Sequence, residues 1–441
     1  MRKRWAILGA AALSAWIAAG SVVAQDSSQN EGISVVSTMT LPAMPIGEAL
    51  NGVLGEGTIS DDLGIPIGGT GSDLWRSSTD PEGEYWMVTD RGPNVDVEVD
   101  GEERLTFPIP NFTPTILHVR ANGDTLEILE IIPVTGTSGE GVTGVSSSSA
   151  MDPQPYGYLG ESEIPYNPNG MDVEGLVRTA DGGFWLAEEY SPSLVKLDAT
   201  GEVLSRYVPE HLGLTGTDYP VEETLPEILL SRRGNRGFEG LGITPDGSTL
   251  VAILQSPLSN PDKDTGSASR VARILVIDSA TGKPTAEYAY EMEDGPTFDT
   301  GEGIEQGDMK LSGVVAIDAD SLIVLERTDD VARLYSVELS GATNILGTAW
   351  DDVATTPSLE SSEATGFTPV SKTLLADLAA LDLPTKIEGL AIIDAHTIAI
   401  ANDNDFDLGS IEDGSGNWEP GGKSSQIIVV SLPDGIPGLT S

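Results

Sequence analysis

The chain contains no cysteine and only three histidines among its 441 residues. Without cysteine it cannot form a disulfide framework, a zinc ribbon, an iron–sulfur cluster or a thiol nucleophile. Three histidines leave little room for a histidine-rich metal site. These absences exclude thiol chemistry and the softer kinds of metal centre.

Basic residues are also scarce, because 23 Lys and Arg face 69 Asp and Glu, which gives a formal net charge of −46. Nucleic-acid binding through a basic surface needs clustered Lys and Arg, so we exclude that function. Apolar residues make up 39% of the chain, which is enough to bury a core. We therefore expect a folded, monomeric, acidic protein.

Long apolar runs are missing after the N-terminus. There, Arg2, Lys3 and Arg4 precede a short apolar run at 5–19 and small residues at 22–24, which is typical of a cleaved secretory signal. An uncleaved membrane anchor is the alternative, although the run is shorter than the ~20 residues that a span needs. Cleavage would remove three positive charges and take the net charge from −46 to −49. Because disulfides are absent, we expect secretion to a bacterial periplasm or medium, with no transmembrane anchor after cleavage.

One motif recurs five times in the rest of the chain. Each copy has a short apolar strand, a turn rich in Asp, Gly or Ala, and a second apolar strand that ends in polar residues, as in a β-hairpin. The copies begin at Gly71, Glu174, Glu239, Ser312 and Glu388. A third strand-like run follows at 115–120, 193–198, 272–278, 332–338 and 425–431.

Small antiparallel sheets repeated in this way predict an all-β fold, a β-propeller. We expect six blades, with five as the alternative, because the stretch at 72–174 is long enough to hold a degenerate blade. A two-sheet sandwich is also possible, but it does not explain the late recurrence of the motif. The best helix candidate is 374–381.

The same pattern suggests the limits of the domains. We expect a signal peptide at 1–24, an N-terminal extension at 25–68, one propeller domain at 69–432 and a C-terminal tail at 433–441.

Hairpin geometry gathers polar residues from each repeat. The start of the first strand and the end of the second strand lie at the same edge of an antiparallel hairpin. If each hairpin is the inner part of a blade, these residues converge at one mouth of the central channel. The residues at these edges are Ser72, Asp73, Asp90, Arg91, Glu174, Glu188, Glu189, Glu239, Gln255, Ser312, Glu326, Arg327, Glu388, Asn402, Asp403 and Asn404.

Converging carboxylates repel one another, so either some hold protons or a cation lies among them. Ca²⁺ binds about six to eight oxygens and needs neither His nor Cys, although another divalent cation is possible. The alternative is that each Glu hydrogen-bonds to backbone amides of its own blade. The predicted metal ligands are Glu174, Glu239, Glu388, Asp403, Asn404 and Asp90.

Several ordered motifs carry a family resemblance. They are the segment at 172–192 with its Asp-Val-Glu-Gly-Leu opening, Asn-Arg-Gly-Phe-Glu-Gly-Leu at 235–241, Leu-Glu-Arg at 325–327, Lys-Ile-Glu-Gly-Leu at 386–390 and Asn-Asp-Asn-Asp-Phe at 402–406. Together they resemble the family called "esterase-like activity of phytase", or phytase-like domain, of exported bacterial proteins. The resemblance runs from about Gly69 to Val430. It implies an exported, propeller-like hydrolase of phosphoesters or carboxylic esters.

The chain lacks a Gly-x-Ser-x-Gly elbow, a P-loop and a His-Glu-x-x-His helix, so a water molecule activated by a metal is the expected nucleophile. One of Glu188, Glu189 or Glu326 would be the catalytic base. Arg91, Arg236 and Arg327 would bind an anionic substrate oxygen, since the Arg fork meets two phosphate oxygens, or would simply pair with the carboxylates.

The predicted function is hydrolysis of a small-molecule phosphoester. A calcium-dependent lactonase or carboxylesterase, and a non-catalytic propeller that calcium stabilises, are the alternatives.

Overall fold

The computed structural model describes residues 32–411 and 418–439, so the predicted signal peptide at 1–24 lies outside the described residues. Strands dominate this part of the chain, alongside two short α-helices, α1 (Ile46–Leu54) and α2 (Lys263–Ala268). No helix among the described residues is long and apolar enough to cross a membrane. The predicted all-β class is confirmed.

Most strands belong to four-stranded units that begin with the predicted hairpins. From the inner to the outer edge, the first two units are β2 (Asp73–Trp75), β3 (Glu84–Val88), β6 (Thr115–Asn122) and β7 (Thr125–Pro133), then β9 (Val173–Arg178), β10 (Phe184–Glu188), β11 (Ser193–Leu197) and β12 (Val203–Pro209), with β13 (Val221–Leu225) added outside β12.

The third and fourth units follow directly along the chain. They are β14 (Phe238–Ile243), β15 (Thr249–Leu254), β16 (Val271–Asp278) and β17 (Lys283–Glu291), then β18 (Lys310–Ala316), β19 (Ser321–Arg327), β20 (Ala332–Glu338) and β21 (Ser371–Asp377). The last unit comprises β22 (Ile387–Asp394), β23 (Thr397–Asn402), β26 (Gln426–Ser431) and β1 (Ser34–Thr40).

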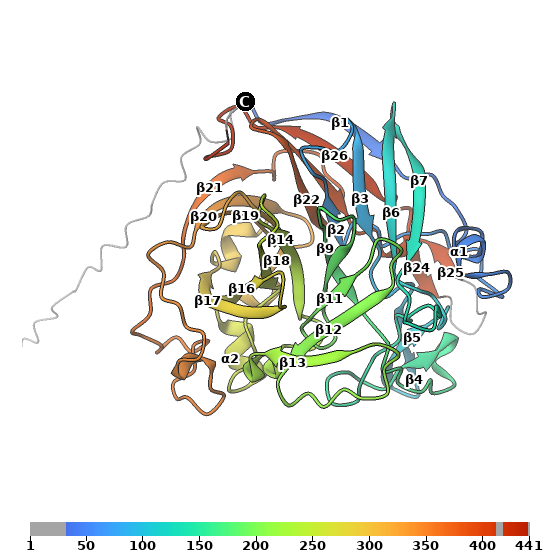
Figure 1. Cartoon of the computed structure of the whole chain (residues 1–441), viewed down its shortest axis with the longest axis horizontal. Coiled ribbons are helices and arrows are strands. Elements are labelled where there is room, and N and C mark those ends of the chain that lie inside the picture. The colour runs from blue at the N-terminus through green and yellow to red at the C-terminus, as the bar shows by residue number, and fades with distance from the viewer. Residues whose placement is uncertain (1–31, 412–417, 440–441) are drawn as a thin grey trace, which may run out of the picture.

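The first strands of these units form a closed ring. Strand β2 contacts β9, β9 contacts β14, β14 contacts β18, β18 contacts β22, and β22 contacts β2. In Figure 1 these five strands lie near the centre, whereas β7, β13, β17 and β21 lie toward the rim. This radial arrangement of small antiparallel sheets is a β-propeller.

The expected six blades are not confirmed, because the described sheets group into five such units. The stretch where a sixth was expected instead forms a small sheet of β4 (Val95–Val99), β5 (Glu102–Phe107) and β8 (Tyr156–Gly157). A second small sheet pairs β24 (Leu408–Ile411) with β25 (Trp418–Pro420). Both are insertions outside the ring of first strands.

Strand β1 closes the propeller. It pairs antiparallel with β26, and its residue Thr40 also pairs with Thr125 of β7, which joins the first and last units into one eight-stranded sheet. Residues 34–40 therefore lie in the sheet of the last unit, although the sequence analysis assigned them to an extension. Their partner strand, β26, lies almost four hundred residues later in the sequence.

The blades are buried on both faces, which explains why their strands are apolar almost throughout. In β10, Phe184 and Leu186 pack toward the first unit, whereas Trp185 and Ala187 pack toward the third. Alternation along a strand sends successive side chains to opposite faces. One apolar run therefore fills two inter-blade cores.

The glycine of the Glu-Gly-Leu motif lets neighbouring inner strands approach closely. A Cβ atom on Gly240 would lie 2.1 Å from the carbonyl oxygen of Ser312, and one on Gly389 would lie 2.9 Å from Leu74. Only glycine fits such an approach. The motif therefore has a structural reason within the ring itself.

The helix predicted at 374–381 is wrong. Residues 371–377 form β21, the outer strand that pairs with β20. This segment pairs with the otherwise free edge of β20. In addition, Arg333 Nε donates a hydrogen bond to Asp377 Oδ2 at 3.0 Å across the two strands. Tertiary pairing overrides the helical preference of Leu and Ala.

Candidate functional site

Three glutamates of the Glu-Gly-Leu motifs lie in β-bulges at the inner edges of their sheets. In β9 the residues on either side of Glu174 pair with β10, but Glu174 itself has no partner. The same interruption leaves Glu239 of β14 and Glu388 of β22 unpaired. A bulge re-aims the side chain of the extra residue. The local sequence thus frees three carboxylates from the ladders of the ring.

These carboxylates meet in two overlapping groups. Carboxylate oxygens of Asp90, Asp172 and Glu174 all lie within 4.8 Å of one another, and so do those of Glu174, Glu239 and Glu388. Glu174 belongs to both groups. Of the six predicted metal ligands, the structure brings Asp90, Glu174, Glu239 and Glu388 together in this way.

Asp172 belongs to the site, and the sequence analysis missed it. It directly precedes β9 and is buried. Its Oδ2 accepts a hydrogen bond from Arg91 Nη1 at 2.8 Å, and its Oδ1 accepts one from the Arg91 backbone amide at 3.1 Å. The Asp-x-Glu spacing could have found it, because residues two apart on an extended segment share a face.

Arg327 and Ser312 hold the second group together. Arg327 Nε donates to Ser312 Oγ at 2.9 Å, and Ser312 Oγ donates to Glu239 Oε1 at 3.2 Å. The Arg327 guanidinium also forms ion pairs with Glu388 and, at 3.6 Å, with Glu239. Arg327, which we predicted to bind the substrate, is therefore already paired with carboxylates of the ring.

Several oxygens of the site have no protein partner. Among the described residues, none donates a hydrogen bond to the carboxylate of Glu174 or Glu189, and Glu189 Oε1 and Glu239 Oε2 are buried without a partner. Leaving a buried acceptor unsatisfied costs about 1–3 kcal/mol, and more for a charged group. These atoms indicate that a ligand completes the site.

Burial and mutual repulsion disfavour the charged forms of these groups. Burial raises the pKa of Glu174 well above its usual range, and the neighbouring Asp172 and Glu239 add to the effect. Burial and Asp172 do the same for the pKa of Glu189. The pKa of Glu388 rises to about 8 through burial, against the opposing charge of Arg327. Either protons or a cation must offset this excess of negative charge.

The other two predicted arginines differ in their pairing. Arg91 forms the ion pair with Asp172 and a hydrogen bond with Asn235. Arg236 donates to the carbonyl of Met309 at 3.1 Å and forms no ion pair within the described part of the chain. Burial, together with the nearby Arg233, lowers the pKa of Arg236 to about 10. Arg236 is thus a partly exposed cation that no ion pair holds among the described residues, although the charges of Glu189 and Glu239 act on it.

Glu188 and Glu326 face away from the axis. The Glu188 carboxylate is fully buried and accepts hydrogen bonds from three backbone amides and from Ser193, and it also pairs with Arg206 at 2.7 Å. Glu326 bonds to Tyr290 of the preceding blade and to Lys372 of its own blade. Alternation along the strand explains both positions, because Glu189 and Arg327 follow them on the other face.

Asp403 and Asn404 lie at the edge of the site but are occupied by protein groups. Asp403 Oδ2 lies 3.4 Å from Lys386 Nζ, and its Oδ1 accepts the backbone amide of Asp405 at 2.9 Å. Asn404 Oδ1 accepts hydrogen bonds from the Gly69 amide and from Ser425. These side chains fasten loops of the last blade, and neither belongs to the two carboxylate groups.

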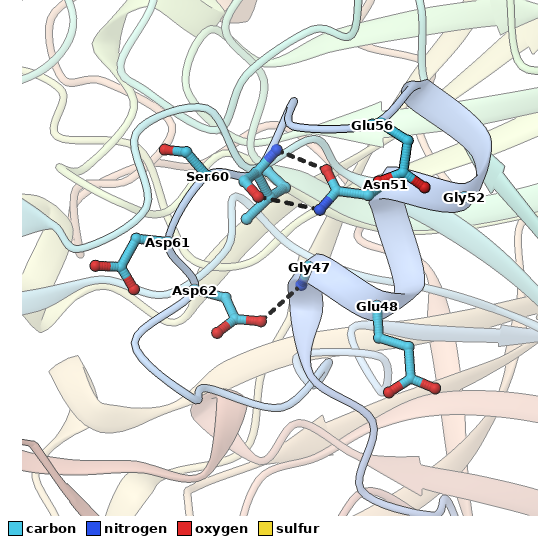
Figure 2. A pocket seen from close by; sticks show the side chains of 9 residues that line it. Gly47, Glu48, Asn51, Gly52, Glu56, Ser60, Asp61 and Asp62 are labelled. Carbon is cyan, nitrogen blue, oxygen red and sulfur yellow. Dashed lines mark hydrogen bonds between the residues drawn. The ribbon is translucent and has the colours of Figure 1, made fainter.

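A surface hollow lies elsewhere, beside α1, and is lined by Glu48, Glu56, Asp61 and Asp62. Figure 2 shows that Asn51 and Asp62 bond to backbone groups within the hollow. Asp62 accepts the Gly47 amide at 2.9 Å, and Asn51 bonds to both backbone groups of Ile59. These contacts fix the loop after α1, and the hollow contains none of the site residues.

Comparison with known proteins shows which family the chain matches. A family model described as esterase-like activity of phytase matches residues 65–406. An uncharacterized secreted protein of Arthroderma benhamiae is 29% identical over 286 residues, which are 55% of this chain and 56% of that protein. The match thus spans about half the length of this relative.

Solved structures give weaker likenesses. A luciferin-regenerating enzyme has a TM-score of 0.35 at 10% identity and covers 85% of this chain and 94% of its own. The β-propeller domain of Myceliophteria thermophila Cps50 (Swd1) has a TM-score of 0.29 at 13% identity, with 83% and 98% covered.

Proposed function

The chain belongs to the phytase-like family, described as having esterase-like activity of phytase, and on that premise we propose that it is a metal-dependent ester hydrolase whose favoured substrate is a phosphoester. One observation carries this proposal. Carboxylates without hydrogen-bond partners, on Glu174 and Glu189, lie at the same mouth as Arg236, a guanidinium without an ion pair. The mouth thus offers separate sites for a cation and for an anion.

The donor set fits a hard divalent cation, with Ca²⁺ favoured. The two groups supply carboxylate oxygens, and one of these, Glu239 Oε2, is buried without a partner. When bound, the cation would polarise an ester oxygen and make a water molecule more acidic. The residues that would hold it are Asp90, Asp172, Glu174, Glu239 and Glu388.

Glu189 is our choice for the group that accepts a proton from the attacking water. It is 2% exposed, lies beside Asp172 and Glu239, and its carboxylate is free of hydrogen bonds from the described residues. The charges of Arg91 and Arg232 oppose the rise in its pKa and so favour the form that accepts a proton. Glu188 and Glu326 do not take this role, since their oxygens are already bonded.

Arg236 would bind the anionic oxygen of the substrate. A chain with a net charge of −46 repels anions at long range, so a phosphoester needs a local cation at the mouth. Arg327 and Ser312 would act differently, by keeping Glu239 and Glu388 in place. Hydrolysis of a lactone or neutral ester, and ligand binding without turnover, are the competing outcomes of the test below.

We also propose that the protein is secreted and acts outside the cytoplasm. The basic and apolar segments at 1–24 support export, and the relative from Arthroderma benhamiae is described as secreted. The mass of the N-terminal peptide of the mature protein would test cleavage after Ala24.

The experiment compares p-nitrophenyl phosphate with p-nitrophenyl acetate and a lactone, with and without a chelator. Arg236→Gln should lower kcat/KM for the phosphoester roughly 10- to 100-fold, as expected for a lost charged hydrogen bond, and leave acetate turnover unchanged. Glu189→Gln should lower kcat by roughly 10²- to 10⁴-fold. The exposed Glu48→Gln at α1 is the matched control.

Three results would contradict the proposal. Turnover that a chelator does not affect would exclude the metal. Faster turnover of neutral esters, with no effect of Arg236→Gln, would favour the lactonase or carboxylesterase. Calcium-dependent melting without hydrolysis of any ester would indicate a binding propeller.

A further inference from the structure

We propose that the axial site holds two divalent cations that share Glu174. This inference rests on the proposed function, because it concerns the number of ions at the same site. Its geometric basis is that the carboxylates form two groups of three, and that Glu174 is the member common to both. A carboxylate has two oxygens and can therefore serve two ligands at once.

The position of Glu174 suits a bridging role. The bulge in β9 leaves it unpaired, and no described residue donates a hydrogen bond to its carboxylate. Asp172 lies two residues before Glu174, whereas Asp90, Glu239 and Glu388 reach it from three other blades. Both oxygens of Glu174 are thus left for ligands that are not protein groups.

Each group also keeps an arginine of its own. Arg91 pairs with Asp172 in the first group, whereas Arg327 pairs with Glu239 and Glu388 in the second. Each arginine fixes the carboxylates of one group without touching Glu174. This division keeps the other carboxylates of the two groups in separate ion-pair networks and leaves Glu174 outside both.

A second observation, independent of the groups, indicates a ligand on both sides. Glu189 belongs to neither group, is 2% exposed, and has a buried Oε1 without a partner. The negative charges of Asp172 in the first group and of Glu239 in the second both raise the pKa of Glu189. Glu239 Oε2 is also buried without a partner. An unpaired buried carboxylate oxygen is costly, and a cation held by the second group would satisfy Glu239 Oε2.

The test counts ions directly. Full-length mature protein is stripped with a chelator, dialysed against increasing Ca²⁺, and measured by elemental analysis. We expect two Ca²⁺ per chain at saturation. Asp172→Asn, which alters only the first group, should bind one, and Glu239→Gln, which alters only the second, should also bind one. Glu174→Gln should weaken both sites at least tenfold, and Glu48→Gln should still bind two.

A spectroscopic measurement keeps the test decisive if a variant fails to fold. Wild-type protein loaded with two equivalents of Mn²⁺ should give an exchange-coupled electron paramagnetic resonance spectrum, and one equivalent should give an uncoupled one. A single Ca²⁺ per wild-type chain, or two uncoupled Mn²⁺ ions, would overturn the inference. One ion with chelator-sensitive hydrolysis would overturn this inference alone, whereas two bound ions without ester hydrolysis would overturn only the proposed function.

Discussion

Glu188 and Glu189 are neighbours in the sequence, equally buried, and opposite in their surroundings. On the blade side, Glu188 has backbone amides, a hydroxyl and Arg206 as partners. On the axis side, Glu189 has an oxygen without any partner and carboxylates for neighbours. The donors around Glu188 fix it in the fold, whereas the lack of donors at Glu189 leaves its carboxylate open to a ligand or a proton.

The first prediction tests this contrast through stability. Glu188→Gln should lower the free energy of unfolding by about 3–5 kcal/mol, because Arg206 would remain buried without its counter-ion. Glu189→Gln, measured in the same urea titration with chelator present, should not lower it, since that change removes a charge from a repulsive cluster. Equal losses in both variants would mean that the two faces do not differ.

When Ca²⁺ is bound, the axial carboxylates should stabilise the folded state, which they do not do in its absence. At a free Ca²⁺ concentration of 100 times Kd, wild-type protein should gain about 2.7 kcal/mol in unfolding free energy for each bound ion, because only the folded state presents the site. Glu239→Gln should gain clearly less, and Glu48→Gln should gain as much as the wild type. Differential scanning calorimetry with and without a chelator gives the comparison. An equal gain in all three proteins would place the calcium site elsewhere.

A smaller effect on stability is expected from Glu287, a buried carboxylate far from the axis. Arg273 pairs with both Glu287 and Glu360, and burial, with Asp351 nearby, raises the pKa of Glu287 to about 8. The unfolded chain has the ordinary Glu pKa of about 4.3. Protonation of Glu287 therefore favours folding, and this contribution is complete below the ordinary pKa and is lost as pH rises through about 8.

The corresponding measurement is urea unfolding at pH 5.5 and 8.5 with chelator present. The loss of stability between these pH values should be larger in the wild type than in Glu287→Gln. An identical loss would show that Glu287 does not titrate in this range. A proton would then neutralise the buried carboxylate of Glu287, whereas we propose that a cation neutralises the axial carboxylates.

Much of the fold was predictable, because local patterns and geometry agree. The hairpins and the third strand of each unit are confirmed at the expected places, such as β9 to β11 and β14 to β16. The pairing of β1 with β26 was not predictable, since nothing in residues 34–40 indicates a partner so far along the chain. The segment at 374–381 misled because its composition favours a helix, although the edge of β20 recruits it as a strand.

The candidate site was only partly predictable for a similar reason. Hairpin geometry correctly brings Glu174, Glu239 and Glu388 to one mouth. It does not tell which of two adjacent acids faces the axis, because the bulges that set the phase at β9 and β10 leave no mark in the sequence. Asp172 could have been found from its spacing to Glu174.

The central claim is that the unpartnered axial carboxylates hold a divalent cation. The most direct measurement is elemental analysis of freshly purified protein after dialysis against metal-free buffer, with wild type and Glu174→Gln side by side. We predict at least one tightly bound divalent ion per wild-type chain and its loss in Glu174→Gln. A wild-type protein without bound metal that does not take up Ca²⁺ when it is supplied, or a variant that retains as much metal as the wild type, would contradict the account.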